Sequence, residues 1–196
     1  MSPPAAKPAA DKPGRNAGDT RARILAAART RFSSDAYEHV GTRDIAADAG
    51  VDAALVSRYF GGKEKLFGEV IAGAFRVEDH LPESLATLGE HLVHLVMDDA
   101  KKPHEDGFDP LRLLLRASGS PATAAMVSAH FHADFVQPLG KLLRGPDAEL
   151  RAALIASYVL GLATMKHALG SPALASGAQR KAAALMGVAI QACVAE

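Results

Sequence analysis

The sequence predicts an all-α protein of about nine helices, with an N-terminal three-helix bundle followed by a larger helical domain. Two observations lead to this prediction. Apolar residues recur at helical spacing in segment after segment, and no segment alternates apolar and polar residues as a half-buried strand would. Helix start and stop signals, mainly Asp, Ser, Pro and Gly, divide these segments into lengths typical of globular helices.

Length and composition are those of a soluble protein with its own hydrophobic core. The chain has 196 residues, of which 48% are hydrophobic and 22% are charged. No run approaches the roughly 18 uncharged apolar residues of a membrane span, and the N-terminus lacks the apolar stretch of a secretory signal. The single cysteine, Cys193, excludes an internal disulfide and is typical of a reducing compartment. We therefore expect a cytoplasmic protein with no membrane partner.

Charge is unevenly distributed, although the formal net charge is +0. Residues 1–67 contain 11 Lys and Arg against 8 Asp and Glu, so the remainder has a matching acidic excess. A basic N-terminal third favours a polyanionic partner for that part alone. The excess is small and decides nothing by itself.

Three parts are predicted along the chain. Residues 1–18 are rich in Pro, Ala, Lys and Gly without periodicity, which predicts a disordered tail. Residues 19–67 contain a first helix and then two short helices, and residues 68–196 contain the remaining helices. A helix from Lys63 to about Phe75 is expected to connect the two folded parts.

The segment that follows the first helix has the signals of a helix-turn-helix. Thr42 is the predicted N-cap of a short helix that Gly50 ends, because glycine readily adopts the left-handed position after a helix. Asp52 is the predicted cap of a second helix, which runs to Phe60. Two helices joined by a three- to four-residue turn containing glycine make this motif.

Start signals also divide the second part into helices. Asp or Ser followed by proline is an N-cap with proline in the first turn, and Ser-x-x-Gln is the spacing of a capping box. Pro138 should kink the helix that contains it. The predicted starts are Pro82, Asp109-Pro110, Ser120-Pro121, Asp147 and Ser176.

The stretch from Thr20 to Ile71 contains, at fixed spacing, Phe32, Tyr37, Thr42, Ile45-Ala46-x-x-Ala49-Gly50-Val51, Tyr59-Phe60 and Lys63-Glu64-x-Leu66-Phe67. With these residues it resembles the DNA-binding domain of the TetR family of bacterial transcriptional repressors. The resemblance implies a homodimer that binds an operator in double-stranded DNA through paired recognition helices. It also implies that a small molecule, bound in the C-terminal domain, releases the DNA. Repression itself is implied only by this resemblance.

The resemblance implies particular DNA contacts. Thr42, Tyr59 and Lys63 match residues that contact phosphates, and Arg43 lies where some members contact a base. The family commonly has tyrosine at the position of Ser57, so one aromatic phosphate contact is lost here. A lysine at a helix start opposes the helix dipole unless a phosphate lies there. For Tyr59, packing in the core remains the alternative.

The residue types in the second motif helix are independently suited to DNA. A major groove admits a helix, and arginine can pair with guanine, a contact worth about 1–3 kcal/mol of discrimination. Leu55 could touch a thymine methyl group or pack against the first helix, and both interpretations stay open. The short or basic residues on the predicted outer face are Ala53, Ala54, Ser57 and Arg58.

Candidate effector residues lie on two helices of the second part. Each of them could equally be an ordinary core or surface residue. Because apolar residues predominate there, we expect a moderately hydrophobic effector. The candidates are Arg116, His130, Phe131, Asp134 and Phe135.

Histidines raise a metal-sensing regulator as an alternative. His91 and His94 are spaced i, i+3, and His130 and Asp134 are spaced i, i+4, so either pair could contribute to a metal site. No cysteine cluster or longer signature supports this, and we predict neither a metal nor a cofactor.

The last two helices are rich in Ala, Gly and Leu, which permits close helix approach and predicts a four-helix dimer bundle. Two-fold symmetry would place the recognition helices about 34–36 Å apart, or a multiple of this, on a near-palindromic operator. The predicted interface residues are Leu154, Tyr158, Gly161, Leu162, Met165, Leu185 and Val188.

Two other classes of function remain to be compared with a DNA-binding regulator. An enzyme is disfavoured, because no nucleophile–base pairing, phosphate loop or paired-carboxylate signature is present, and we predict no catalytic residue. A helical binding protein without a transcriptional role, in which the motif helices only pack, stays as the second alternative.

Overall fold

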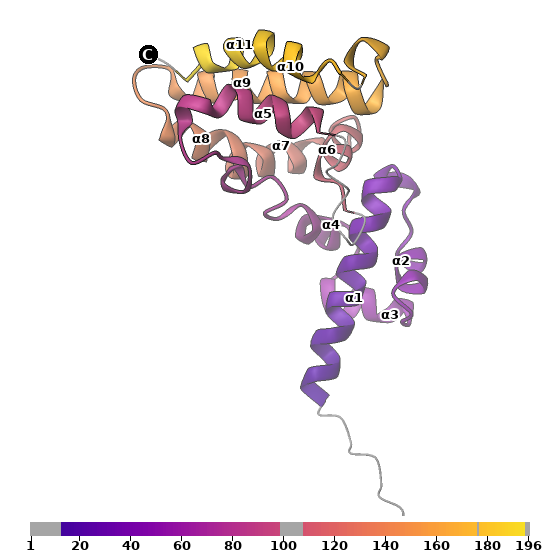
Figure 1. Ribbon diagram of the computed structural model, residues 1–196. Helices are drawn as coiled ribbons and strands as arrows, with labels where there is room; N and C mark the ends of the chain where they lie inside the picture. Colours follow the sequence, from indigo (N-terminus) through magenta and orange to yellow (C-terminus); the bar gives the residue numbers. More distant parts are fainter. Residues whose placement is uncertain (1–12, 99–107, 176, 195–196) are drawn as a thin grey trace, which may run out of the picture.

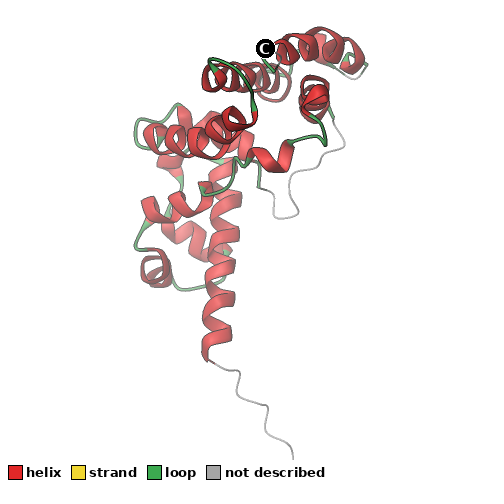
Figure 2. Ribbon diagram, turned by 90° about the vertical axis from the view of Figure 1, so that its left-hand side faces the viewer, coloured by secondary structure: helices red, strands yellow, loops and turns green. Residues whose placement is uncertain are grey.

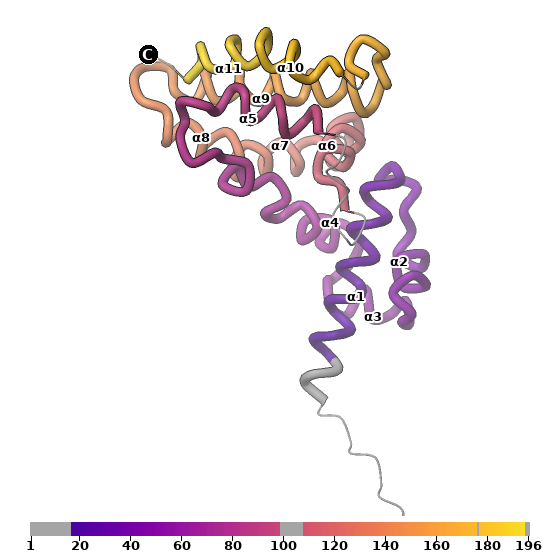
Figure 3. The backbone as a smooth tube through the Cα atoms, viewed as in Figure 1, coloured from indigo at the N-terminus to yellow at the C-terminus, as the bar shows by residue number. Residues whose placement is uncertain are grey.

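The computed structural model describes residues 13–98, 108–175 and 177–194, and every regular element in these ranges is helical (Figures 1 and 2). The all-α prediction is confirmed. Helices α1–α4 form an N-terminal head, and the later helices form a C-terminal body (Figure 1). Figure 3 follows the chain from the head through α4 into the body, where α11 lies far from α3.

The described residues form α-helices, π-helical turns and 3-10 helices. Three π-helical turns join or extend neighbouring helices, so that the described residues form nine helical rods. The α-helices are α1 (Pro13–Ser34), α2 (Thr42–Asp48), α3 (Ala53–Phe60), α4 (Lys63–Ile71), α5 (Leu88–Met97), α6 (Pro110–Ser118), α7 (Ala124–Phe131), α8 (Gln137–Leu142), α9 (Ala148–Ala163), α10 (Gln179–Ala182) and α11 (Val188–Ala192). The π-helical turns are η4 (His132–Val136), η5 (Thr164–Ala168) and η7 (Ala183–Gly187), and the 3-10 helices are η1 (Tyr37–His39), η2 (Val77–His80), η3 (Leu85–Thr87) and η6 (Pro172–Leu174).

Two helices of the head have ends that differ from the prediction. Helix α1 begins at Pro13, inside the segment expected to be a tail, and proline is well suited to a first helical turn. Helix α4 ends at Ile71 rather than Phe75. Gly73 has a φ of 68°, a left-handed conformation that does not continue an α-helix.

Helix starts in the body were predicted with mixed success. Asp109 is the N-cap of α6, and its carboxylate accepts the Arg112 N–H at 3.0 Å, as expected. Ser120 does not cap α7, because its hydroxyl donates to the Glu38 carboxylate and the helix begins only at Ala124. Asp147 is an N-cap without a side-chain hydrogen bond.

Three further expectations concern prolines and a serine. The helix predicted from Pro82 begins only at Leu88, after the 3-10 turn η3. Pro138 has no N–H to donate to the helix. It lies just after the π-helical turn η4, in which the spacing of the backbone hydrogen bonds differs from that of an α-helix. Ser176 lies outside the described residues, and α10 begins at Gln179.

Two hydrophobic cores hold the molecule together. The core of the head is built around Phe32 and Phe67, whose ring centroids are 5.0 Å apart in an edge-to-face arrangement. It extends past residue 67, because Leu113 of α6 and Val127 of α7 are also part of it. The core of the body includes buried residues of α5, α8, α9 and α11. The head is therefore packed against α6 and α7 as well as joined to the body by α4.

Helix α9 and its extension η5 have an unusual composition. The segment Ala148–Ala168 has a mean hydropathy of 1.3, so by length and composition alone it could cross a membrane, and only 28% of its apolar window is buried within the chain. Arg151 and Lys166 bound its uncharged stretch, which is therefore shorter than the roughly 18 uncharged apolar residues of a membrane span. One face packs in the body core through Ile155 and Leu162, and the opposite face is exposed.

Candidate DNA-binding surface and effector cavity

The turn between α2 and α3 follows from two residues. Gly50 has a φ of 62°, the left-handed region that glycine adopts at little cost. The Asp52 carboxylate accepts the Ala54 N–H at 2.7 Å and is the N-cap of α3. Both signals that predicted the turn are confirmed.

The start of α2 corrects a prediction. Gly41, not Thr42, is the N-cap, and the Asp44 carboxylate accepts the Gly41 N–H at 3.2 Å. Thr42 is the first residue inside the helix. Because Asp44 lies three residues after the cap, it satisfies the N–H group at the helix start, and the Thr42 hydroxyl is not needed as a cap.

Three arginines of α1 hold the other head helices in place. Arg21 pairs with Glu69 of α4, and Arg23 donates to carbonyl oxygens at the end of α2. Arg31 donates to Asp48 of α2, and this contact lowers the pKa of the Asp48 carboxyl. These contacts use basic side chains within the chain. The basic excess of the N-terminal third is therefore not all available to DNA.

The outer face of α3 presents short and basic side chains. Val56 and Phe60 are buried in the head core, which turns Ala54, Ser57 and Arg58 towards solvent. This pattern follows from the helical period, because residues two apart point in different directions. Among the described residues, Arg58 makes no ion pair or hydrogen bond.

The remaining predicted contacts have differing exposure. Ala53, Leu55 and Tyr59 are half-buried and pack partly against the head core. This supports packing for Leu55 and leaves one side of Tyr59 accessible. Arg43 is exposed in the first turn of α2, next to the half-buried Thr42.

Lys63 begins α4 and lies on an aromatic ring. Its ammonium nitrogen is 4.2 Å from the centre of the Tyr37 ring, a cation–π contact. Burial lowers the pKa of Lys63, while the nearby Glu38 opposes this shift. Burial likewise raises the pKa of the Tyr37 hydroxyl. The ring provides an internal partner for a lysine that the helix dipole disfavours.

A cavity of about 250 Å³ lies where the two cores meet, and we call it the inter-core cavity. Phe75 and Leu114 of its wall belong to the head core, and Leu92 and Phe135 belong to the body core. Phe131 contacts both cores. The full lining is Ala74, Phe75, His80, Leu92, Leu95, Val96, Asp109, Pro110, Leu111, Leu114, Phe131, Phe135, Val159, Leu160, Ala163 and His167.

Comparison with protein families agrees with this architecture. Residues 24–70 match the model of the tetR family of bacterial regulatory proteins. Residues 86–194, more than half of the chain, match the tetracyclin repressor-like C-terminal domain. This chain belongs to the TetR family of transcriptional regulators. The resemblance expected from the helix-turn-helix residues is confirmed.

Solved structures with the same fold include other TetR-family proteins. A TetR-family regulator from Streptomyces coelicolor A3 is 28% identical, with a TM-score of 0.57, and the match covers 96% of this chain and 100% of that one. NalD, the secondary repressor of the MexAB-OprM multidrug efflux pump in Pseudomonas aeruginosa, is 20% identical, with a TM-score of 0.63 and coverage of 92% and 98%. Among curated proteins there is no match.

The predicted effector residues of this TetR-family chain lie in different places. Phe131 and Phe135 line the inter-core cavity, whereas Arg116 and His130 do not. Asp134 has another role, because its carboxylate accepts the Gly73 N–H at 3.1 Å and so holds the turn that follows α4. Most cavity residues were missed, because an apolar residue at helical spacing looks the same in sequence whether it lines a core or a cavity.

The histidine pairs do not come together. Within the described ranges, no three His, Cys, Asp or Glu side chains are grouped as metal ligands would be. His94 Nε2 instead lies 3.5 Å from the Oε1 atom of Glu90 on the same helix, and His132 Nε2 lies 2.7 Å from Glu149 Oε1. Asp134 is engaged with Gly73, as described above.

Large apolar side chains are exposed on the last helices, and we refer to them together as the apolar stripe. Leu154, Tyr158 and Met165 contribute from α9 and η5, and Leu185 and Val188 contribute from η7 and α11, with exposures between 38% and 68%. Gly161 is exposed on the same segment of α9. Leu162 is only 4% exposed and packs in the body core, so it lies inside the chain rather than on this stripe.

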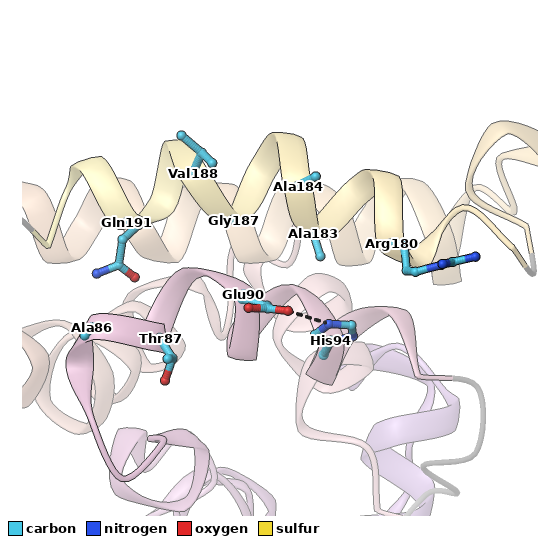
Figure 4. A pocket seen from close by; sticks show the side chains of 10 residues that line it. All are labelled: Ala86, Thr87, Glu90, His94, Arg180, Ala183, Ala184, Gly187, Val188 and Gln191. Atoms are coloured by element: carbon cyan, nitrogen blue, oxygen red, sulfur yellow. Dashed lines mark ion pairs between the residues drawn. The ribbon is translucent and has the colours of Figure 1, made fainter.

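A second, more open groove of about 460 Å³ runs between α5 and the rod formed by α10, η7 and α11 (Figure 4). Gly89 and Gly187 form the close crossing of these helices, because a Cβ at Gly89 would lie 2.1 Å from the Gly187 oxygen. Across the crossing, the Gln191 side-chain amide accepts a hydrogen bond from the Gly89 N–H and donates one to the Leu85 carbonyl oxygen. The groove lies beside this tight helix crossing, and we assign no ligand to it.

Proposed function

We propose that this TetR-family regulator is a repressor that binds a near-palindromic operator as a homodimer. A small, fairly hydrophobic effector in the inter-core cavity releases the DNA. Because its target is DNA, we place the protein in the cytoplasm, with neither catalytic activity nor a membrane partner. Repression, as opposed to activation, rests on analogy with the family.

The outer face of α3 is the observation that best supports DNA binding. Its exposed side chains are short enough for the helix backbone to approach base edges, and Arg58 can pair with guanine. Arg43 and Lys63, at the starts of α2 and α4, are placed to add base or phosphate contacts. We therefore propose that α3 is the recognition helix.

The apolar stripe supports dimerisation. Exposed apolar surface of this kind marks an interaction site, and a second copy of the chain would cover it by packing α9 and α11 against their equivalents. Gly161 has no atom within 4 Å of a Cβ position, which leaves room for a partner helix. The dimer explains the membrane-like hydropathy of α9 without a membrane.

The release mechanism that we propose uses the segment that follows α4. Phe75 forms part of the cavity wall and packs edge-on against Phe131, with centroids 5.6 Å apart. Asp134 anchors Gly73 beside it. An effector that displaces this wall would tilt α4 and change the separation of the two recognition helices in the dimer. If effector-bound and DNA-bound structures had the same separation, this mechanism would be wrong.

The test of DNA binding begins with selection of random duplex DNA by the purified protein. The proposal expects a near-palindromic sequence, bound far more tightly than random duplex and with strong salt dependence. Alanine at Arg43, Arg58 or Tyr59 should weaken this binding while the dimer stays intact. Arg76→Ala serves as the control, because Arg76 is an exposed arginine outside the helix-turn-helix.

Weak binding without sequence preference would contradict the proposal. The same conclusion would follow if the alanine variants bound the selected DNA as tightly as the control did. A helical binding protein whose motif helices only pack would then be the better interpretation.

A further inference from the structure

Among the described residues, the wall of the inter-core cavity offers a ligand no permanently charged cation. The part of the lining that the structure describes contains neither lysine nor arginine, and its two histidines, His80 and His167, already have partners within the chain. An anionic ligand would lose its water without gaining a compensating charge, which is strongly unfavourable in an apolar site. The cavity therefore disfavours carboxylates, phosphates and sulfonates.

The polar side chains of the lining already have partners. The Asp109 carboxylate caps α6 and lies 3.3 Å from the Arg112 guanidinium. His167 Nε2 lies 2.9 Å from the Val96 carbonyl oxygen, and His80 also has a partner within the chain. These groups leave little unsatisfied polarity for a charged or highly polar ligand to match.

Aromatic side chains give the cavity its shape. The rings of Phe131 and Phe135 are nearly parallel, with 7° between their planes and centroids 5.3 Å apart. Phe75 stands at 72° to Phe131. Aromatic rings prefer offset stacking or edge-to-face contact with one another, so this wall favours a ligand that is itself aromatic.

Cavity size limits the ligand further. About 250 Å³ is below the roughly 300–1,000 Å³ of pockets that bind drug-sized molecules. We infer that the inter-core cavity binds an uncharged, compact aromatic molecule of one or two rings. The assignment of this molecule as the effector rests on the proposed function, whereas its binding does not.

The test uses two probes that share a ring system but differ in charge. 1-Naphthol is uncharged at neutral pH, and 1-naphthoate carries a carboxylate. Calorimetric titration of the full-length protein should show 1-naphthol binding with one site per chain, and 1-naphthoate binding at least about tenfold more weakly. Equal or tighter binding of 1-naphthoate, or no binding of 1-naphthol, would overturn the inference.

Two variants place the site. Leu111→Trp, at a half-buried position of the wall, should fill the cavity and abolish 1-naphthol binding. Thr87→Trp places the same ring at an exposed position in the groove of Figure 4 and should leave binding unchanged. Circular dichroism and thermal melting confirm that both variants fold. Should Leu111→Trp fail to fold, Phe131→Leu, which removes one aromatic ring, should weaken 1-naphthol binding. Equal loss in Thr87→Trp would overturn the assignment of the site.

A separate measurement distinguishes the ligand from the function. Operator affinity is measured with and without saturating 1-naphthol. If 1-naphthol binds in the cavity but leaves operator affinity unchanged, the ligand class stands and the effector role fails. If no operator is found at all, the proposed function fails, and the titrations still decide the ligand class.

Discussion

The outer face of α3 and the apolar stripe are both exposed, but their side chains have opposite chemistry. On α3, the exposed side chains of Ala54, Ser57 and Arg58 are short or basic. On the stripe, Leu185 and Val188 are each 68% exposed. The outer face of α3 can remain exposed to water and bind a polyanion reversibly, whereas the apolar stripe favours a permanent protein partner.

This difference predicts how each surface responds to conditions. Contacts between basic side chains and phosphates release counterions, so they weaken steeply as salt rises. Burial of apolar side chains does not depend on counterions and should persist at high salt. DNA binding should therefore be lost at salt concentrations at which the dimer is intact.

The largest expected effect comes from placing charge on the apolar stripe. Leu185→Glu combined with Val188→Glu should dissociate the dimer, because four carboxylates would be buried at the two-fold interface. Operator affinity should fall by about 10²-fold or more, because the two half-sites are then bound independently. Sedimentation velocity and operator titration measure the two effects. Leu142→Glu, at a 44% exposed leucine of α8, is the control. A double variant that remains dimeric would rule out the stripe as the interface.

A pair of glycines distinguishes internal contacts from contacts with a partner. Gly89→Ala should destabilise the chain by about 1–3 kcal/mol, because its Cβ would meet the backbone of Gly187. Gly161→Ala has open space and should be neutral or stabilise the chain by up to about 1 kcal/mol. Chemical denaturation at low protein concentration measures both. Equal destabilisation by the two substitutions would contradict the difference between the sites.

A smaller effect is expected at the first turn of α4. Lys63→Ala should weaken binding to all duplex sequences alike and reduce the slope of log affinity against log salt by about 1. Lys65→Ala changes an exposed lysine two residues away and should have less effect. Affinity measured over a series of salt concentrations provides the comparison. If both variants left the slope unchanged, Lys63 would not contact a phosphate.

The smallest effect concerns pH. Burial lowers the pKa of Lys63 in the free protein below its ordinary value of 10.5, and a neighbouring phosphate would raise it again. Binding should then take up protons, so DNA affinity should fall as pH rises from the lowered pKa towards the raised one. Lys63→Arg, which stays charged, should remove this dependence. A pH profile identical in the two proteins would contradict the coupling.

Sequence reasoning succeeded where a signal and its effect lie close together. Gly50 and Asp52 act on the turn that contains them, and Asp109 caps the helix that it begins. It was wrong about Thr42, because Gly41 and Asp44 together offered a competing cap in the same four residues. Local signals therefore located the helices well and their first residues less well.

The sequence by itself determined that the chain is helical, that it contains a helix-turn-helix and that it belongs with TetR-family regulators. Only the tertiary structure placed the inter-core cavity and showed that Asp134 holds Gly73. These two residues are 61 positions apart in the chain. Periodicity identifies which face of a helix is apolar, but which other helix covers that face depends on packing between distant segments. The same limit explains why the sequence does not distinguish Leu162 from Leu185. Both are apolar and both lie in the last helices, but Leu162 is buried and Leu185 is exposed.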